Sequence, residues 1–175
     1  MKLFKKLGFI VLTLALSLGF AACSGGSKQG EELKKEYACS SVIFNLDYSG
    51  AYYELVDLDV DVYVNEVKAK NLTVKESAGN INFEVGGLPS LASVKIYLSQ
   101  TRNSTPVDSS KSYSSSIHPE FFVTRYYTNG TFDNGGVLDL GTTTQTYTHD
   151  NIEEYINNYS EIIFTMDLDD EGFVL

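Results

Sequence analysis

The chain contains no tryptophan, only two cysteines and only two histidines among its 175 residues. Without tryptophan, the broadest platform for stacking on a sugar ring is missing, so aromatic recognition would fall to the 12 tyrosines. Cys23 and Cys39 can form at most one disulfide, which excludes a disulfide-rich scaffold. His118 and His149 are too few for a three-histidine zinc site, and neither lies in an H-E-x-x-H motif. We expect both histidines on the surface, His118 in a loop before Pro119 and His149 at a helix start.

Other catalytic signatures are missing as well. No G-x-S-x-G elbow is present, which leaves a serine hydrolase of that type unsupported. Glycosidases need two facing carboxylates, but aspartate and glutamate are so abundant here that a pair proves nothing. The sequence therefore predicts a protein that is not an enzyme and carries no cofactor.

Basic residues are scarce. Thirteen lysines and arginines stand against 23 acidic residues, giving a formal net charge of -10. Such a field repels a phosphate backbone, so we expect no nucleic-acid partner. We interpret most of this excess of acidic residues as a contribution to solubility.

The first 22 residues have the features of an export signal. Lys2, Lys5 and Lys6 precede an apolar run at 7–20, which is shorter than the roughly 20 residues of a membrane-spanning helix. Small residues then lead to Cys23, and this order is typical of a secretory signal peptide. Residues 20–23 (FAAC) resemble the bacterial lipobox, so residues 1–22 are expected to be a lipoprotein signal peptide. An ordinary signal peptide cut after Ala22 is the alternative.

The lipobox resemblance implies that Cys23 is acylated and becomes the mature N-terminus, anchored in the lipid bilayer. By resemblance to sorting signals, Ser24 favours the outer membrane, with the domain periplasmic or surface-exposed. Residues 23–36 are polar and contain glycine, which is typical of a flexible tether. Removing residues 1–22 takes away three lysines and no acid, so the net charge moves from -10 to -13.

Residues 37–175 have the pattern of one β domain. Apolar side chains alternate with polar ones along several short segments, which indicates strands with one buried and one wet face. The inward rows are expected to be Val42, Phe44, Leu46 and Tyr48; Leu58, Val60, Val62 and Val64; Ile81, Phe83 and Val85; Val94, Ile96 and Leu98; and Ile162, Phe164, Met166 and Leu168. We predict a mainly β fold, a two-sheet antiparallel β-sandwich of Ig-like or transthyretin-like type, with a small β-barrel as the alternative.

Two segments depart from this pattern. Asp150 is expected to cap a helix together with Glu153, three residues further on. The apolar spacing of Ile152, Tyr155, Ile156 and Tyr159 predicts this one short helix near the C-terminus. Residues 99–116 are rich in serine and threonine, and we expect a long surface loop or an irregular hairpin there.

Two acidic groups invite comparison with cation sites. Asp57, Asp59 and Asp61 alternate along one strand, where such side chains stand too far apart to share one ion, so we expect a solvated face. The acidic C-terminal run begins like an EF-hand loop but ends too early to complete one. It leaves a weak cation candidate at Asp167, Asp169 and Asp170, and no metal site is otherwise expected.

Tyrosines in turns and at strand ends are the candidate binding residues. A tyrosine offers an apolar ring together with a hydroxyl, which suits either a sugar or a protein surface. Ordinary packing at sheet edges is the competing interpretation. The candidates are Tyr52, Tyr53, Tyr113, Tyr126 and Tyr127.

One further segment carries a resemblance. Residues 82–89 (NFEVGGLP), followed by a strand at 94–98, are similar to the strand, Gly-Leu-Pro turn and strand of Bacteroidota-type secreted sandwich lipoproteins, including fimbrillin-like surface proteins. The resemblance implies a surface lipoprotein and assigns no functional residue. We therefore expect a membrane-anchored, non-catalytic binding or adhesion module for a glycan or envelope protein. The alternative is a structural or accessory subunit of a fimbria-like assembly, joined by strand addition.

Overall fold

The computed structural model describes residues 35–158 and 161–175. The expected signal peptide, Cys23 and all of the expected tether except residues 35 and 36 lie outside the described residues. The described elements are β1 (Tyr37–Ser49), the 3-10 helix η1 (Ala51–Glu54), β2 (Val56–Val64), β3 (Val67–Val74), β4 (Gly79–Leu88), β5 (Ser93–Arg102), β6 (Ser112–Tyr127), β7 (Phe132–Asp139), β8 (Thr143–Thr148), the α-helix α2 (His149–Asn158) and β9 (Glu161–Asp167).

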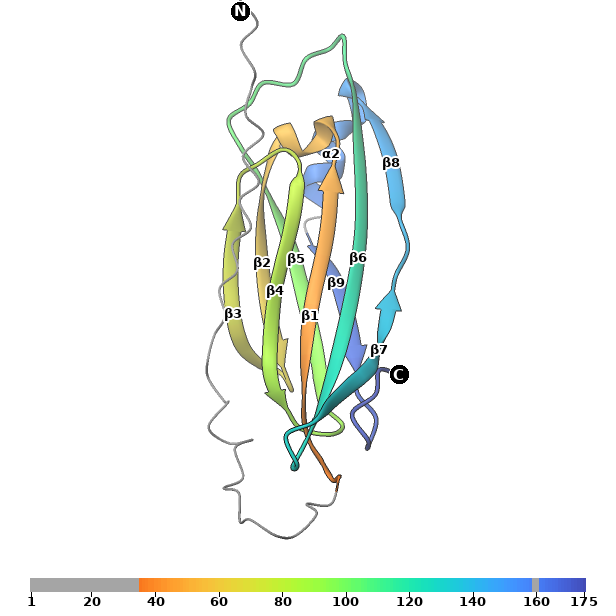
Figure 1. Cartoon of the computed structure of the whole chain (residues 1–175). Coiled ribbons are helices and arrows are strands. Elements are labelled where there is room, and N and C mark those ends of the chain that lie inside the picture. Colours follow the sequence, from red (N-terminus) through yellow and green to blue (C-terminus); the bar gives the residue numbers. More distant parts are fainter. Residues whose placement is uncertain (1–34, 159–160) are drawn as a thin grey trace, which may run out of the picture.

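The strands form two antiparallel sheets that pack face to face (Figure 1). One sheet has the order β4-β1-β6-β7, and β8 pairs with β6 beyond the end of β7. The other has the order β3-β2-β5-β9. The predicted two-sheet sandwich is confirmed, and the alternative of a closed barrel is wrong because the strands of the described chain lie in two separate sheets.

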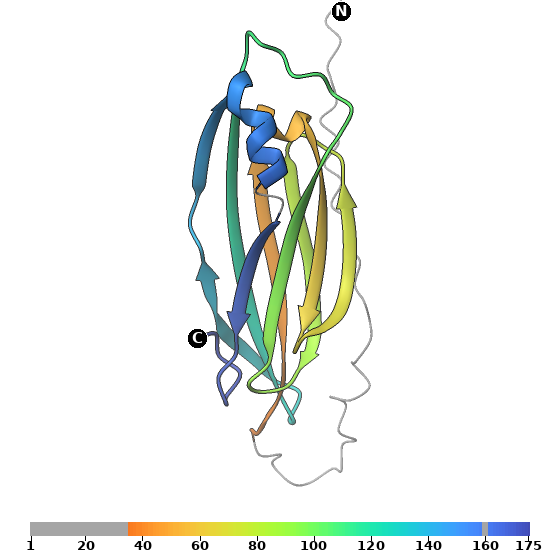
Figure 2. The same ribbon diagram turned by 180° about the vertical axis from the view of Figure 1, so that it is seen from behind.

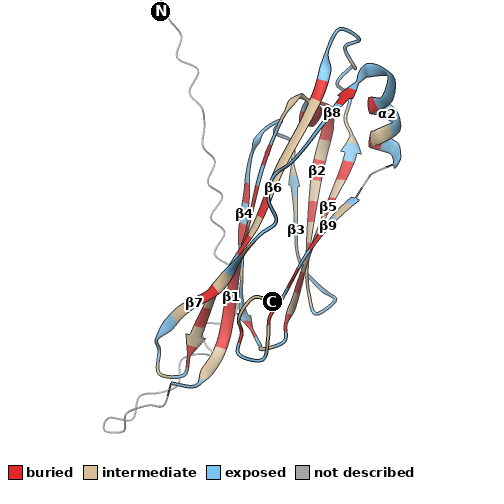
Figure 3. Ribbon diagram, turned by 90° about the vertical axis from the view of Figure 1, so that its right-hand side faces the viewer, coloured by how far each residue is buried: buried red, intermediate tan, exposed pale blue. Residues whose placement is uncertain are grey.

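The core lies between the sheets, where the predicted inward rows meet (Figure 3). Phe44 sits at its centre, with its ring centroid 5.3 Å from that of Phe83, 5.0 Å from that of Phe121 and 5.8 Å from that of Phe164. All four rings are buried. Burial of such a ring is worth roughly 3–5 kcal/mol when measured by truncation to alanine, so this cluster is a main source of the fold's stability.

The short helix predicted near the C-terminus is present and closes one end of the sandwich together with η1 (Figure 2). Ile152 and Ile156 are buried as the helical spacing predicted, Tyr155 is half-buried, and Tyr159 lies outside the described residues. The predicted capping pair is wrong, because α2 already begins at His149 and places Asp150 inside its first turn. The Asn151 side chain accepts a hydrogen bond from the backbone of Thr148 instead, over 2.9 Å.

Half of the segment 99–116, where we expect a long surface loop or an irregular hairpin, is strand. β5 continues to Arg102 and β6 begins at Ser112, which leaves residues 103–111 as the loop. Gln100 and Tyr113 point inward and are buried, and serine on the alternate positions suits a wet face. The Tyr113 hydroxyl accepts a hydrogen bond of 2.6 Å from the backbone N–H of Asp108, which holds the loop against the domain.

His118 and Pro119 also belong to a strand rather than to a loop. Pro119 lacks a backbone donor, and such residues are normally confined to strand edges. Here the partners on one side of β6 change at this point, because β7 ends at Asp139 and β8 begins at Thr143. The missing N–H donor of Pro119 therefore lies between the β7 and β8 pairings of β6, where no strand hydrogen bond is required of it.

Cys39 lies near the start of β1, where it is buried and forms no disulfide in the described chain. This agrees with the prediction that it is a small packing residue. The sandwich is therefore stabilised by its apolar core.

Candidate functional site

The tyrosines selected from the sequence are mostly not available for binding. Tyr52, Tyr53, Tyr113 and Tyr127 are all buried, so the expectation that they are exposed is wrong. Tyr126 is only partly buried and lies near Phe132, with ring centroids 6.2 Å apart. The prediction rested on the turn-like sequence around these tyrosines. In the structure, neighbouring elements bury four of them.

Most of the covering occurs at the α2 end of the sandwich, where tyrosine rings pack on one another. The ring of Tyr52 lies 5.3 Å from that of Tyr53 and 5.6 Å from that of Tyr147, while Tyr147 stacks on Tyr155 at 4.2 Å. The Tyr53 hydroxyl lies 2.9 Å from the Ser115 hydroxyl. Burial raises the pKa of Tyr53 to about 12, which keeps its hydroxyl protonated at neutral pH. The cluster is suited to packing and not to acid–base chemistry.

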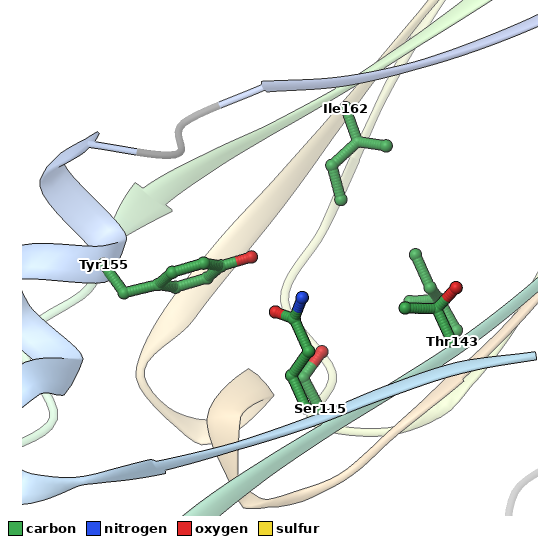
Figure 4. Close-up of a pocket in the computed structure, with 6 residues that line it drawn as sticks. Ser115, Thr143, Tyr155 and Ile162 are labelled. Carbon is green, nitrogen blue, oxygen red and sulfur yellow. The ribbon is translucent and has the colours of Figure 1, made fainter.

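A small pocket opens beside this cluster, between the two sheets (Figure 4). Tyr155 extends from α2 with its hydroxyl directed into the space bounded by Ser115, Thr143 and Ile162. The pocket measures about 50 Å³. Ligand pockets usually measure roughly 300–1,000 Å³, so this one is too small for a sugar ring or a cofactor.

In the acidic C-terminal turn, the Asp169 carboxylate accepts hydrogen bonds from the backbone. Asp169 accepts hydrogen bonds from the N–H groups of Glu171 and Phe173 at 2.9 and 2.8 Å. Asp167, Asp169 and Asp170 do not form a converging ligand set, since the trio of the described chain with ligand atoms mutually within 4.8 Å is His118, Glu120 and Asp139. The weak cation candidate at the C-terminal turn therefore has no geometric support.

Two neighbouring tyrosines instead reach solvent on the outer face of the β3-β2-β5-β9 sheet, which Figure 2 presents to the viewer, whereas the exposed rings of Phe122 and Phe132 belong to the other sheet. Tyr63 on β2 and Tyr97 on β5 are partly exposed, and their ring centroids lie 5.0 Å apart in an edge-to-face arrangement. Ile163 on β9 pairs with Tyr97 and is 51% exposed. We call Tyr63, Tyr97 and Ile163 the tyrosine patch.

Polar side chains surround the tyrosine patch and are fixed by hydrogen bonds and ion pairs with one another. Asp61 pairs with Tyr97 across the strands and accepts hydrogen bonds from Lys68 at 2.6 Å and Asn71 at 2.5 Å. The Lys68 ammonium and the Asn71 amide thereby hold the pKa of the Asp61 carboxyl below its ordinary value. On the other side of Tyr63, Lys95 pairs with Glu66. Carboxylate, amide and ammonium groups are thus fixed around an apolar centre.

This arrangement can make two kinds of contact at once. The rings and Ile163 offer apolar surface, and the surrounding groups offer donors and acceptors that are already oriented. Tyr63 and Tyr97 are not among the tyrosines that the sequence singled out, although the sequence held a signal for Tyr63. Tyr63 shares one face of β2 with Asp57, Asp59 and Asp61, so the prediction of a wet face for those aspartates applies to Tyr63 as well.

No family model matches this chain, and no curated protein or solved structure matches it either. Within the described residues, no helix has the length and apolar character needed to cross a membrane.

Proposed function

We propose that the chain is an exported lipoprotein, anchored to the cell envelope through acylated Cys23, whose β-sandwich is a non-catalytic module that binds an uncharged glycan. The tyrosine patch is the observation that carries the binding part of the proposal. The anchoring part rests on the basic, apolar and small-residue order of residues 1–23. Several acyl chains on one cysteine would give stable attachment, and residues 24–36 would act as the spacer.

A glycan suits the tyrosine patch for three reasons. Aromatic rings accept the C–H faces of sugars, and the oriented groups around Tyr97 can exchange hydrogen bonds with sugar hydroxyls. The patch lies on an open sheet face, which can accept a chain of sugars without a deep pocket. The net charge of -13 after signal removal disfavours sulfated or uronic polysaccharides, so the expected ligand is uncharged.

A glycan array, combined with a pull-down from outer-membrane extract, tests this function. The soluble chain 24–175 is expected to retain uncharged glycans, and Tyr97→Ala is expected to weaken retention by more than about tenfold, or ~1.4 kcal/mol. Tyr126→Ala is the matched control, because Tyr126 is a partly buried tyrosine on the other sheet. Silence on the array would contradict glycan binding, and protein capture that depends on Tyr97 would point to a protein ligand instead.

A second function, a subunit of a fimbria-like envelope assembly, is favoured by one edge of the sandwich. β9 pairs only with β5 and has its charged residues, Glu161 and Asp167, at its two ends, whereas the opposite edge strand, β3, carries Lys68 and Lys70 within the strand. Charged side chains usually protect edges from strand addition, so β9 is the more receptive edge. Laddering of the native protein on a mild-detergent gel would support assembly, and a strictly monomeric protein would contradict it.

A further inference from the structure

Three side chains with metal-ligating atoms meet on the outer face of the β4-β1-β6-β7 sheet, away from the tyrosine patch. His118 and Glu120 are two residues apart on β6, so they share one face of the strand. Asp139, the last residue of β7, pairs directly with Glu120. One ligating atom from each of the three lies within 4.8 Å of the others, and all three side chains are reached by solvent.

The donor set selects a class of cation. An imidazole nitrogen together with two carboxylates suits Zn²⁺ and related first-row divalent ions, whereas Ca²⁺ and Mg²⁺ prefer oxygen ligands alone. His118 Nε2 lies 2.8 Å from Asp139 Oδ1 in a hydrogen bond, which a cation bound by both groups would replace with release of the proton. Two ligands about 2.1 Å from a tetrahedral ion lie roughly 3.4 Å apart, which a small side-chain rotation provides here.

Groups outside the trio orient its two carboxylates. Asn45 on β1 donates to Glu120 Oε2 over 3.2 Å, and Asn80 on β4 donates to the side-chain oxygen of Asn45 over 2.6 Å. The backbone N–H of Gly141 donates to Asp139 Oδ1 over 2.7 Å, which holds this carboxylate beside His118. Such supporting contacts commonly fix metal ligands and raise affinity.

Charge and strand geometry favour a cation at the same place. Asp47 on β1 pairs with His118 and adds a further carboxylate to the surroundings of the trio. The change from β7 to β8 at Pro119 leaves Asp139 at a strand end, where the chain turns at Gly141 with φ of +72°. We propose that His118, Glu120 and Asp139 bind one divalent first-row transition cation, with a fourth position left to water.

Isothermal titration of Zn²⁺ into an untagged, metal-free chain 24–175 tests this site. We expect one ion per chain, and His118→Gln should weaken binding by about 100-fold or more, because loss of an outer contact alone often costs 10–100-fold. Asn45→Ala, which removes such an outer contact, should weaken binding by about tenfold. Circular dichroism of each variant checks that the fold is retained.

His149→Gln is the matched control, because His149 is also exposed and paired with a carboxylate, that of Asp150 at 2.9 Å. It should leave Zn²⁺ binding unchanged. Absence of binding to the wild-type chain would overturn the proposal, and so would equal losses in the His118 and His149 variants. A Co²⁺ complex that lacks the absorption bands of a low-coordinate site would also count against it.

Discussion

At the residue scale, two groups of tyrosines differ in their surroundings and chemistry. Tyr52, Tyr53 and Tyr147 lie in the packed cluster at the α2 end, where desolvation raises the pKa of each hydroxyl. Tyr63 and Tyr97 lie on an open sheet face. The first group stabilises the fold, and the second provides the proposed contact surface.

Buried tyrosines make the fold sensitive to alkali. Because the pKa of Tyr53 is raised to about 12, its contribution to stability is complete below the unfolded value near ~10 and is lost as pH rises between these values. We expect tyrosinate absorbance from the cluster to appear together with loss of the β circular-dichroism signal, in one transition. Tyr53→Phe should reduce the pH dependence of stability. Titration of every tyrosine near pH ~10 with the fold intact would contradict this assignment.

Single residues were the hardest feature to predict from the sequence. Alternation identifies which residues share a face, and it placed Val42, Phe44 and Leu46 correctly in the core. It does not reveal that η1 folds Tyr52 and Tyr53 under the end of the sandwich, because that covering comes from segments distant in the chain.

At the element scale, Gly50 controls how β1 passes into η1. Its φ of +121° and ψ of +159° define a backbone conformation that is essentially reserved for glycine. An added Cβ would collide with the backbone carbonyl of Ser114 on β6. The close approach positions η1, and with it Tyr52 and Tyr53, against the core.

Gly50→Ala should therefore destabilise the domain by about 2–4 kcal/mol, combining backbone strain with the collision. Gly130→Ala is the matched control, since Gly130 also has positive φ, +81°, but nothing lies within 4 Å of an added Cβ. Its cost should be only about 1 kcal/mol. Urea unfolding of both variants gives the comparison, and equal losses would show that Ser114 is not a constraint.

The elements themselves were largely predictable, and their ends were not. Period-two patterns located most of the strands, and helical spacing located α2. The strand ends in the segment 99–116 escaped prediction because serine-rich sequences resemble loops, whereas buried Gln100 and Tyr113 continue the inward pattern there.

At the scale of the whole molecule, two sheets enclose one apolar core without a disulfide in the described residues. Two outer faces remain, one with the tyrosine patch and the other with the trio of His118, Glu120 and Asp139. The glycan surface and the cation site that we propose therefore lie on different sheets.

We expect attachment to the membrane to depend on the sulfur atom of Cys23. Cys23→Ser removes the thiol that the lipobox resemblance assigns to acylation, so the protein should move from the membrane fraction to the soluble fraction. Labelling with an alkynyl fatty acid should disappear at the same time. Cys39→Ala is the matched control and should stay in the membrane fraction, because Cys39 is a buried core residue. Persistent membrane association of the Cys23 variant would contradict the anchor.

The central claim is that the tyrosine patch contacts the ligand. Nuclear magnetic resonance of the isotope-labelled chain 24–175, titrated with a glycan identified on the array, tests it most directly. The account predicts that the largest shifts occur at Tyr63, Lys95, Tyr97 and Ile163. Shifts confined to the β4-β1-β6-β7 sheet, or unchanged shifts in Tyr63→Ala/Tyr97→Ala, would contradict it.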